Sequence, residues 1–256
     1  MSVMKSQASG GTIASKNAGH SWNQLLRSYG LLGVFALMFM ILFIFSPNFR
    51  NPQNMLNLLQ QNAVNGIIAC GMTLMIITGG FDLSVGATAA LSGVVAASVF
   101  LQVSIPAGIC AALLASLLVG LCNGLLIAKV RISAFVATLG TQIITRGILY
   151  ITTNATPIYG LPSSYMRVGL GSIGPFPIAT SIFFLVVVAT HILLRYMPFG
   201  QHLLATGGNE EASRLSGIDV DRVKIIVYSL GGLLAGLGGL ILLGQTNTGQ
   251  PAAANG

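Results

Sequence analysis

The sequence predicts an all-α integral membrane protein with about seven membrane segments. Hydrophobic residues make up 54% of the 256 residues and charged residues only 7%, whereas a soluble domain carries roughly 25% charged residues. The mean hydropathy is +0.82. The apolar residues also form long runs, and one helix needs about 20 mostly apolar residues to cross a bilayer. These observations place most of the surface in lipid rather than in water.

Seven apolar segments can be drawn along the chain. They cover residues 29–46, 63–79, 85–102, 107–128, 133–151, 178–194 and 225–244. Residues 1–28 are polar and no small-residue cleavage pattern follows them, so we expect a cytoplasmic tail rather than a secretory signal. Residues 29–256 are expected to form one transmembrane domain. Within it, residues 152–177 are rich in Gly, Pro, Ser and Thr and predict an outer surface loop.

Basic residues predict the orientation. If the N-terminus is cytoplasmic and each segment crosses once, nine Lys or Arg lie inside and two, Arg50 and Arg167, lie outside. The nine are Lys5, Lys16, Arg27, Lys129, Arg131, Arg195, Arg214, Arg222 and Lys224. Cytoplasmic loops carry an excess of Lys and Arg, so the N-terminus is predicted inside and the inverted orientation is excluded. The net charge of +7 has the same origin, and without a basic and aromatic cluster it does not indicate nucleic-acid binding.

The second segment begins with a polar face that ends at Asn65, and this face is expected to line an aqueous vestibule. Between the second and third segments stands the only carboxylate outside residues 196–224, Asp82. It belongs to a helix-break motif that also contains Gly79, Gly80, Ser84 and Gly86. A proton or cation relay normally needs further acids in the membrane. We therefore expect Asp82 to be the N-cap of the third segment.

The fifth segment carries a polar stripe at helical spacing. Its members are Thr138, Thr141, Gln142, Thr145 and Arg146, which fall on one face of a helix. A charged residue in a span faces a bundle interior or a wet cavity, and hydroxyl and amide groups suit a polyol. The same groups can instead bond neighbouring helices. Both interpretations stay open, with a structural role for Arg146 placed before a substrate-contacting one.

The predicted inner segment, residues 196–224, holds four of the five carboxylates of the chain. Within it, Asn209 is suited to an N-cap, and Glu210 and Glu211 to the first turn of a helix. Arg214 lies four residues after Glu210, and Gly217 suits the C′ position. A short helix over residues 210–216 is therefore predicted on the cytoplasmic side. It either docks on a partner or is a solvated connection.

Several motifs are absent. There is no Gly-Lys-Ser/Thr for a nucleotide and no HExxH or GxSxG for catalysis. The GxGxxG of residues 169–174 is followed by Pro175 without a βαβ context, so it is a chance match. The three cysteines lie in apolar runs and the three histidines lack metal-ligand spacing. We expect no cofactor, no metal and no enzymatic activity.

Three stretches resemble one family, the ribose-type ABC importer permeases. They are residues 69–86, residues 134–147 and, most specifically, residues 200–218. The resemblance covers the chain after its N-terminal tail and reaches Gln250 and Pro251. Two positions depart from the family pattern, Gln201 and Phe81. Family members continue through further membrane segments, so the resemblance implies that the C-terminal part is missing here.

The resemblance implies a multi-pass protein of a bacterial inner membrane that imports a monosaccharide, ribose or a similar sugar. Such permeases work with a second permease subunit, cytoplasmic ABC ATPase subunits and a periplasmic sugar-binding protein. It implies an ATPase-coupling loop that comprises Gly207, Gly208, Asn209, Glu210, Glu211, Ala212, Arg214 and Gly217. The alternatives are a secondary transporter or channel, which would need more membrane charges than Asp82 and Arg146, and an intramembrane enzyme, for which no nucleophile–base pair is present.

Overall fold

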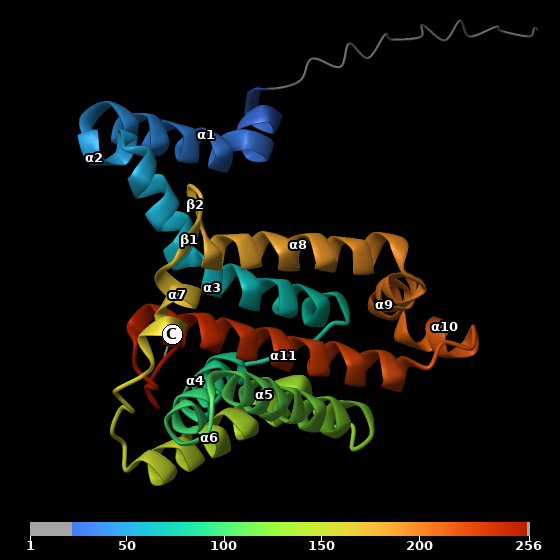
Figure 1. The fold of residues 1–256 in the computed structure, drawn as a ribbon. Coiled ribbons are helices and arrows are strands. Elements are labelled where there is room, and N and C mark those ends of the chain that lie inside the picture. Colours follow the sequence, from blue (N-terminus) through green and yellow to red (C-terminus); the bar gives the residue numbers. More distant parts are fainter. Residues whose placement is uncertain (1–21, 255–256) are drawn as a thin grey trace, which may run out of the picture. The chain divides into compact units, whose positions relative to one another are not determined.

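A computed structural model describes residues 22–254, with side chains described from residue 30 onward. The predicted N-terminal tail therefore lies outside the described residues, apart from residues 22–28. The chain divides into two compact units, Met1–Asn54 and Met55–Gly256. Helices, short turns and one small hairpin make up the described part (Figure 1). The predicted all-α class is confirmed.

The first unit contains helix α1, Trp22–Phe45, and the single-turn helix α2, Pro47–Arg50. Helix α3, Pro52–Ile77, begins here, and Pro52 holds its first position as is usual for proline. The apolar part of α1, Gly30–Phe45, falls in the first predicted membrane segment.

Five helices among the described residues are long and apolar enough to cross a membrane. They are α4 (Val85–Gln102), α5 (Ile105–Ala128), α6 (Ala134–Thr153), α8 (Ile178–Tyr196) and α11 (Val220–Thr246). Each matches a segment that the sequence predicts. The part of α3 beyond residue 54 packs with them, although its polar side chains keep it out of this set. The protein is therefore a polytopic membrane protein in its described part.

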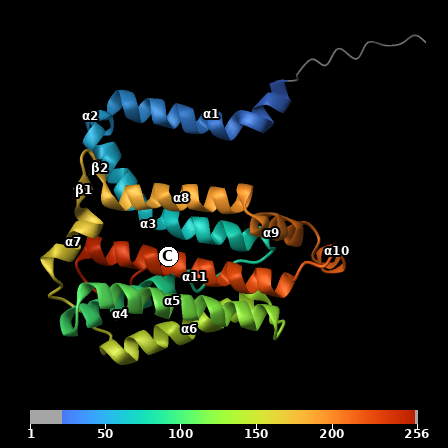
Figure 2. The same ribbon diagram turned by 45° about the vertical axis from the view of Figure 1, so that its right-hand side comes forward.

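Helix α11 is the centre of the second unit. Both ribbon views place it between α3 and α8 on one side and α4, α5 and α6 on the other (Figures 1 and 2). Glycines bring its backbone close to that of α5: a Cβ built on Gly120 would lie 2.3 Å from the carbonyl oxygen of Tyr228 and 3.0 Å from Cα of Gly232. Without a side chain on either glycine, two helices can pack backbone to backbone. Helices α5 and α11 are therefore packed closely at these glycines.

The outer segment is not the surface loop that the sequence predicts. It folds into helix α7, Ser163–Leu170, and a hairpin of β1, Ser172–Ile173, with β2, Phe176–Pro177. Tyr165 of α7 is buried, its ring lies 4.5 Å from that of Phe100, and its hydroxyl donates to the carbonyl of Leu240 at 2.8 Å. One buried tyrosine thus holds the segment against α11. The Gly- and Pro-rich composition of residues 152–177 gives no indication of this contact.

Candidate functional site

A break separates α3 from α4, and it occupies residues 78–84, called here the helix break. Gly79 turns the chain with φ of +80°, a conformation that side chains with a Cβ rarely adopt. The carboxylate Oδ1 of Asp82 accepts from the backbone N–H of Ser84 at 2.6 Å and from its hydroxyl at 2.5 Å. Helix α4 begins at Val85 with Ser84 as N-cap. The predicted N-cap role of Asp82 is therefore wrong by two residues: Asp82 closes the turn that precedes the helix.

The carboxylate of Asp82 is the end of a buried polar network. Asn123 of α5 donates from Nδ2 to Ser84 Oγ at 2.9 Å and to Asp82 Oδ2 at 3.3 Å. Thr141 of α6 donates to Oδ1 of the same Asn123 at 2.6 Å. Asp82, Ser84 and Asn123 are each 3% exposed or less. Asn123 stands five residues before the end of α5, about 7.5 Å along a helix axis, so the network lies inside the helix bundle. It holds the helix break, α5 and α6 in one arrangement.

A cavity of about 710 Å³, called here the membrane cavity, lies beside this network. Its polar wall comes from Asn65 of α3, Asp82 of the helix break and Gln142 of α6. The remaining lining residues are small or aliphatic: Ile68, Leu83, Val85, Gly86 and Ala254. The size falls within the roughly 300–1,000 Å³ of small-molecule sites. Amide and carboxylate groups on an otherwise apolar wall suit a small neutral molecule that carries hydroxyl groups.

The polar side chains of the α6 stripe have two roles: some bond neighbouring elements, and one lines the membrane cavity. Thr138 is buried and accepts from the N–H of Leu83 at 3.2 Å, and Thr141 bonds Asn123. Thr145 is also buried. Only Gln142 lines the membrane cavity. Most of the stripe therefore bonds neighbouring elements, which was one of the two interpretations of the sequence.

The guanidinium of Arg146 is hydrogen-bonded to backbone carbonyl groups of the protein. Its Nη1 donates to the carbonyl of Pro251 at 2.6 Å and its Nη2 to that of Ala253 at 2.7 Å. The guanidinium thus holds residues 247–254, which follow α11, against α6. Gly86 leaves room for the carbonyl of Ala254 beside the start of α4. The sequence contains no local signal for this return of the chain.

Replacing Arg146 by leucine is expected to lower the thermal unfolding midpoint and to expose residues 247–254 to proteolysis. The change removes two charge-assisted hydrogen bonds, each worth about 1.5–3 kcal/mol, and leaves two carbonyls unpaired. Arg146→Lys, which retains the charge without the bidentate geometry, should fall between leucine and the parent. Thermal melting of the purified protein with limited proteolysis measures both effects. Unchanged melting and cleavage in Arg146→Leu would contradict the anchoring role.

A second cavity of about 600 Å³ lies on the other side of the helix break. It is called here the cytoplasmic cavity, after the side on which the sequence predicts residues 196–224. The lining comprises the break (Thr78, Gly79, Gly80), the end of α5 (Ile127, Ala128), the connection to α6 with its first residue (Arg131, Ile132, Ser133, Ala134), α10 (Glu210, Glu211, Arg214) and α11 (Lys224, Tyr228). Tyr228 is 1% exposed and its hydroxyl has no hydrogen-bond partner. The two cavities together flank residues 78–86.

The inner segment contains the predicted short helix. Helix α10, Glu210–Leu215, begins at Asn209, whose Oδ1 accepts from the N–H of Ala212 at 2.9 Å. Gly217 follows its end with φ of +86°, which suits the predicted C′ glycine. Preceding it is α9, Pro198–Gly208, a helix that the sequence reasoning missed although Pro198 at its start is a signal for one.

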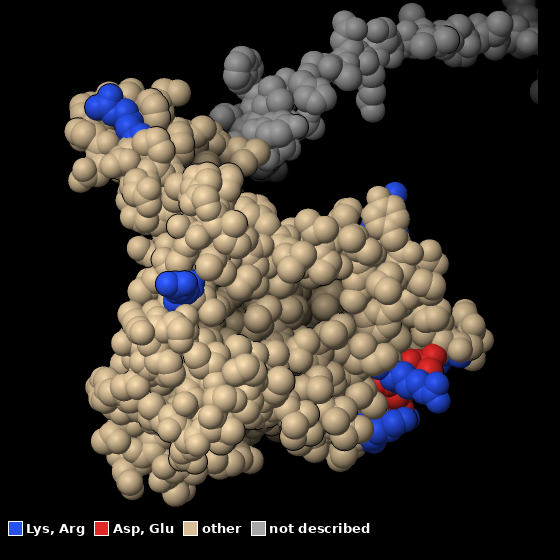
Figure 3. All heavy atoms as spheres, in the orientation of Figure 1, with Lys and Arg blue, Asp and Glu red and all other residues tan. Residues whose placement is uncertain are grey.

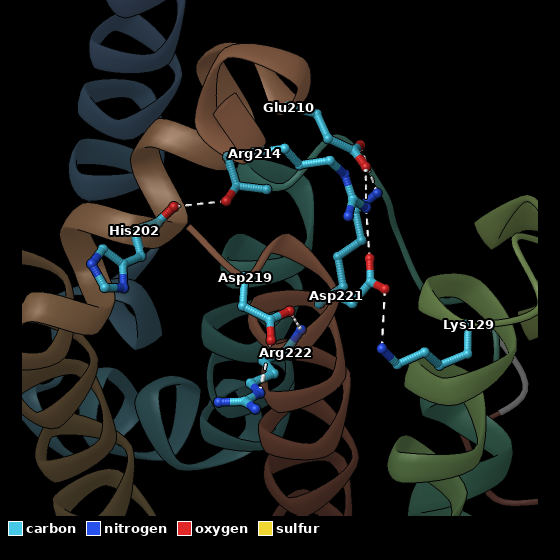
Figure 4. A network of polar contacts seen from close by, with 9 residues as sticks. Lys129, His202, Glu210, Arg214, Asp219, Asp221 and Arg222 are labelled. Atoms are coloured by element: carbon cyan, nitrogen blue, oxygen red, sulfur yellow. Dashed lines mark hydrogen bonds and ion pairs between the residues drawn. The ribbon is translucent and has the colours of Figure 1, made fainter. Parts of the chain in front are cut away.

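Ion pairs join α10 to the ends of the membrane helices (Figure 4). Arg214 contacts Glu210 at 3.1 Å and Asp221 of α11 at 2.6 Å, and Asp221 in turn contacts Lys129 after α5 at 3.1 Å. Lys224 of α11 lies 2.7 Å from the other oxygen of Glu210. The space-filling view shows acidic and basic groups gathered at this end (Figure 3). Surface pairs of this kind contribute about 0–1 kcal/mol each, so the network positions α10 more than it stabilises the fold.

The hydrogen bond from Lys224, and then that from Arg214, holds the pKa of Glu210 below its ordinary value. An acid with a lowered pKa contributes stability above its unfolded pKa, about 4.3 for Glu, and loses it as the pH falls through the folded pKa. The contribution of Glu210 is therefore fully present near neutral pH.

The inner helices also contact the end of α3, next to the helix break. Gly207 of α9 packs against the carbonyl of Ile77, the last residue of α3, at a distance that leaves no room for a Cβ. Gly208 has open space around it. If α9 and α10 move, Gly207 therefore pushes directly on the end of α3, next to Gly79 and Gly80.

No group of residues that could hold a metal ion occurs within residues 22–254. The three cysteines are free thiols.

In comparison with known proteins, the relatives reported below are all described as permeases. The family model described as "Branched-chain amino acid transport system / permease component" matches residues 54–255. The ribose import permease protein RbsC of Bacillus subtilis is 44% identical over 225 residues, 87% of this chain and 70% of that protein. RbsC of Escherichia coli K12 is 42% identical over 216 residues, 82% of this chain and 67% of that protein. The L-arabinose transport system permease protein AraH of E. coli K12 is 39% identical over 259 residues, 100% of this chain and 77% of that protein. No solved structure matches the chain.

Proposed function

The chain belongs to the permease-component family of branched-chain amino acid transport systems, and from this premise we propose that it is the membrane subunit of an ATP-binding-cassette importer for a monosaccharide. The observation that supports this most is the 39–44% identity to ribose and arabinose permeases over 82% or more of the chain. Relatives of this kind are inner-membrane subunits, and this chain is likewise a multi-pass protein of the bacterial inner membrane. Hydrolysis of ATP is assigned to separate subunits.

The membrane cavity is the proposed position of the cargo in the membrane. Asn65, Asp82 and Gln142 supply amide and carboxylate groups for sugar hydroxyls, while Ile68 and Val85 supply apolar wall. Asn65 is exposed in the single chain, and polar groups at this depth do not face lipid at low cost. We therefore place a second permease subunit, a further copy of this chain, over this side, with lipid around the remaining apolar faces. Thr138, Thr141, Thr145 and Arg146 support the wall from behind.

The coupling surface to the ATPase is proposed to be α10 with its flanking residues, Gly207 to Gly217. Helix α10 is exposed except for Ser213, and Leu215 at its end is 86% exposed. An apolar anchor beside exposed charges is what a docking site presents to a partner. Because Gly207 contacts the end of α3, a push on α10 is transmitted to Gly79, Gly80, Asp82, Ser84 and Gly86.

The proposed topology retains seven membrane segments with a cytoplasmic N-terminus. Five spans follow from helix length and hydropathy, and α1 and α3 are proposed as the other two. Lys129, Arg131, Arg214, Arg222 and Lys224 all belong to the end that carries α10, which supports a cytoplasmic position for that end. Residues 29–256 then form one permease domain, preceded by a cytoplasmic tail.

Uptake of labelled ribose is expected to be lost when the chain is deleted from its native cells and restored when it is supplied again. Labelled arabinose and labelled leucine are measured in the same cells, since the relatives carry pentoses and the family description names amino acids. Loss of leucine uptake with both sugars unaffected would contradict a sugar cargo. Loss of none of the three, with the protein present in the membrane, would contradict the cargo class altogether.

A further inference from the structure

The helix break and the first turns of α6 run side by side from one cavity to the other. Gly79 and Gly80 line the cytoplasmic cavity, and Asp82 and Leu83 line the membrane cavity. At the start of α6, its N-cap Ser133 and first residue Ala134 line the cytoplasmic cavity, and Gln142 further along lines the membrane cavity. Each of the two elements therefore lines one cavity with its first residues and the other cavity with its later ones.

Three contacts in register join the two elements. On the cytoplasmic side a Cβ built on Gly80 would lie 3.3 Å from Cβ of Ala134. On the membrane side the N–H of Leu83 donates to Thr138 Oγ1 at 3.2 Å. Between them the rings of Phe81 and Phe135 meet edge to face, with centroids 6.3 Å apart and an interplanar angle of 71°.

Neither ring belongs to the packed interior. Phe81 is 43% exposed and Phe135 is 51% exposed, whereas Asp82 beside Phe81 is 3% exposed. Two aromatic rings thus project from the exposed side of the strip that divides the cavities. Neither ring is among the residues that line the two cavities, so both belong to the strip between them. An apolar constriction at such a place excludes water by dewetting.

We propose that Phe81 and Phe135 form an apolar gate between the membrane cavity and the cytoplasmic cavity. The gate rests on the proposed function in that it lies on the proposed path of the cargo. Gly79 gives the gate its hinge, because its φ of +80° already departs from ordinary backbone conformation. Movement of α3 through Gly207 and Ile77 displaces Phe81 from Phe135 and joins the two cavities.

Thiol accessibility tests the gate without sugar or ATP. Cys70, Cys110 and Cys122 are replaced by serine, and Gln142→Cys places one reporter thiol in the membrane cavity. The full chain is assembled in inside-out vesicles, and a membrane-impermeant thiol reagent is added on the cytoplasmic side. The rate at which position 142 is labelled then measures passage across the gate.

Phe81→Ala and Phe135→Ala are each expected to label position 142 about tenfold faster than the parent, because the apolar constriction is opened. Phe184→Ala is the matched control, since Phe184 is 51% exposed, like the gate residues, and belongs to α8 rather than to the helix break or α6. Arg131→Cys, which reports the cytoplasmic cavity, should label equally in every background and shows that the reagent reaches this side. Thermal melting of each variant checks its fold, and Phe81→Leu and Phe135→Leu, which keep an apolar side chain, replace any alanine variant whose melting midpoint falls.

Equal labelling of position 142 in the parent and in both gate variants, with position 131 unchanged, would overturn the gate. Fast labelling in the parent would overturn it as well, because the path would already be open. The labelling experiment uses a thiol reagent and no sugar, so its result does not depend on the proposed cargo. The gate and the proposed function can therefore be refuted independently of each other.

Discussion

Replacing Gly120 by leucine is expected to remove most of the folded protein from the membrane. A Cβ at this position would lie 2.3 Å from the carbonyl oxygen of Tyr228, so any side chain forces α5 away from α11. Overpacking of a well-packed core usually costs about 1–3 kcal/mol, and contact with backbone on both sides places this change at or above the upper limit. Separation of the two helices also breaks the bonds of Asn123 to the helix break. Yield and thermal midpoint of the detergent-purified protein measure the effect.

Gly147→Leu is the matched control for this change. Gly147 is also a helical glycine in a membrane span, but nothing lies within 4 Å of a Cβ built on it. The midpoint of this variant should stay close to that of the parent. Equal stability of Gly120→Leu and the parent would show that α5 and α11 do not meet at this glycine.

Replacing Leu215 by glutamate is expected to abolish ATP-driven uptake while the protein remains folded. Leu215 is 86% exposed, so the single chain loses almost no packing. At an interface, a buried charge without a partner costs several kcal/mol, which corresponds to more than a hundredfold in affinity. Labelled-ribose uptake and thermal melting of the same preparation separate loss of docking from loss of fold.

Arg222→Gln serves as control for a change at the same end of the molecule. It removes one exposed ion pair, that between Arg222 and Asp219 at 2.8 Å, and leaves α10 intact. Uptake should remain close to that of the parent. If Leu215→Glu and Arg222→Gln transport equally well, α10 is not the docking surface.

Local signals in the sequence predicted α10 well. Asn209, Glu210 and Arg214 act within one or two helical turns, so capping and i,i+4 pairing can be read from their spacing. Five membrane helices could be predicted for a similar reason, since length and hydropathy are local properties. The prediction for Asp82 placed the N-cap of α4 two residues too early, because the N-cap position depends on the backbone angles of Ser84, which the glycines around it leave open.

Contacts between distant parts of the chain escaped the sequence analysis. Asn123 bonds Ser84 and Asp82 from 39 and 41 residues away, and no spacing rule links them. A single asparagine near Gly120 and Gly124, in the middle of an apolar run, was the available signal. The carbonyl partners of Arg146 likewise come from residues 251 and 253, more than 100 positions away. Its structural role could be expected from the cost of a charge in a span, but its partners could not.

The glycines of the inner segment illustrate the same limit. Gly217 could be assigned from local reasoning, since it ends a helix that begins at Asn209. Gly207 is required by the carbonyl of Ile77, at the end of a different helix. Its link to the helix break, on which the coupling proposal depends, became visible only when the two segments were placed together.

The most direct test of the central claim is affinity purification of the chain, tagged at its N-terminus, from gently solubilised native membranes. The eluate is assayed for an ATP-hydrolysing subunit that co-purifies. The permease assignment predicts that an ATPase is recovered with the parent and with Arg222→Gln, and that it is lost with Leu215→Glu. Recovery of an intact chain without any ATPase would contradict an ABC importer subunit and favour a transporter that needs no ATPase partner.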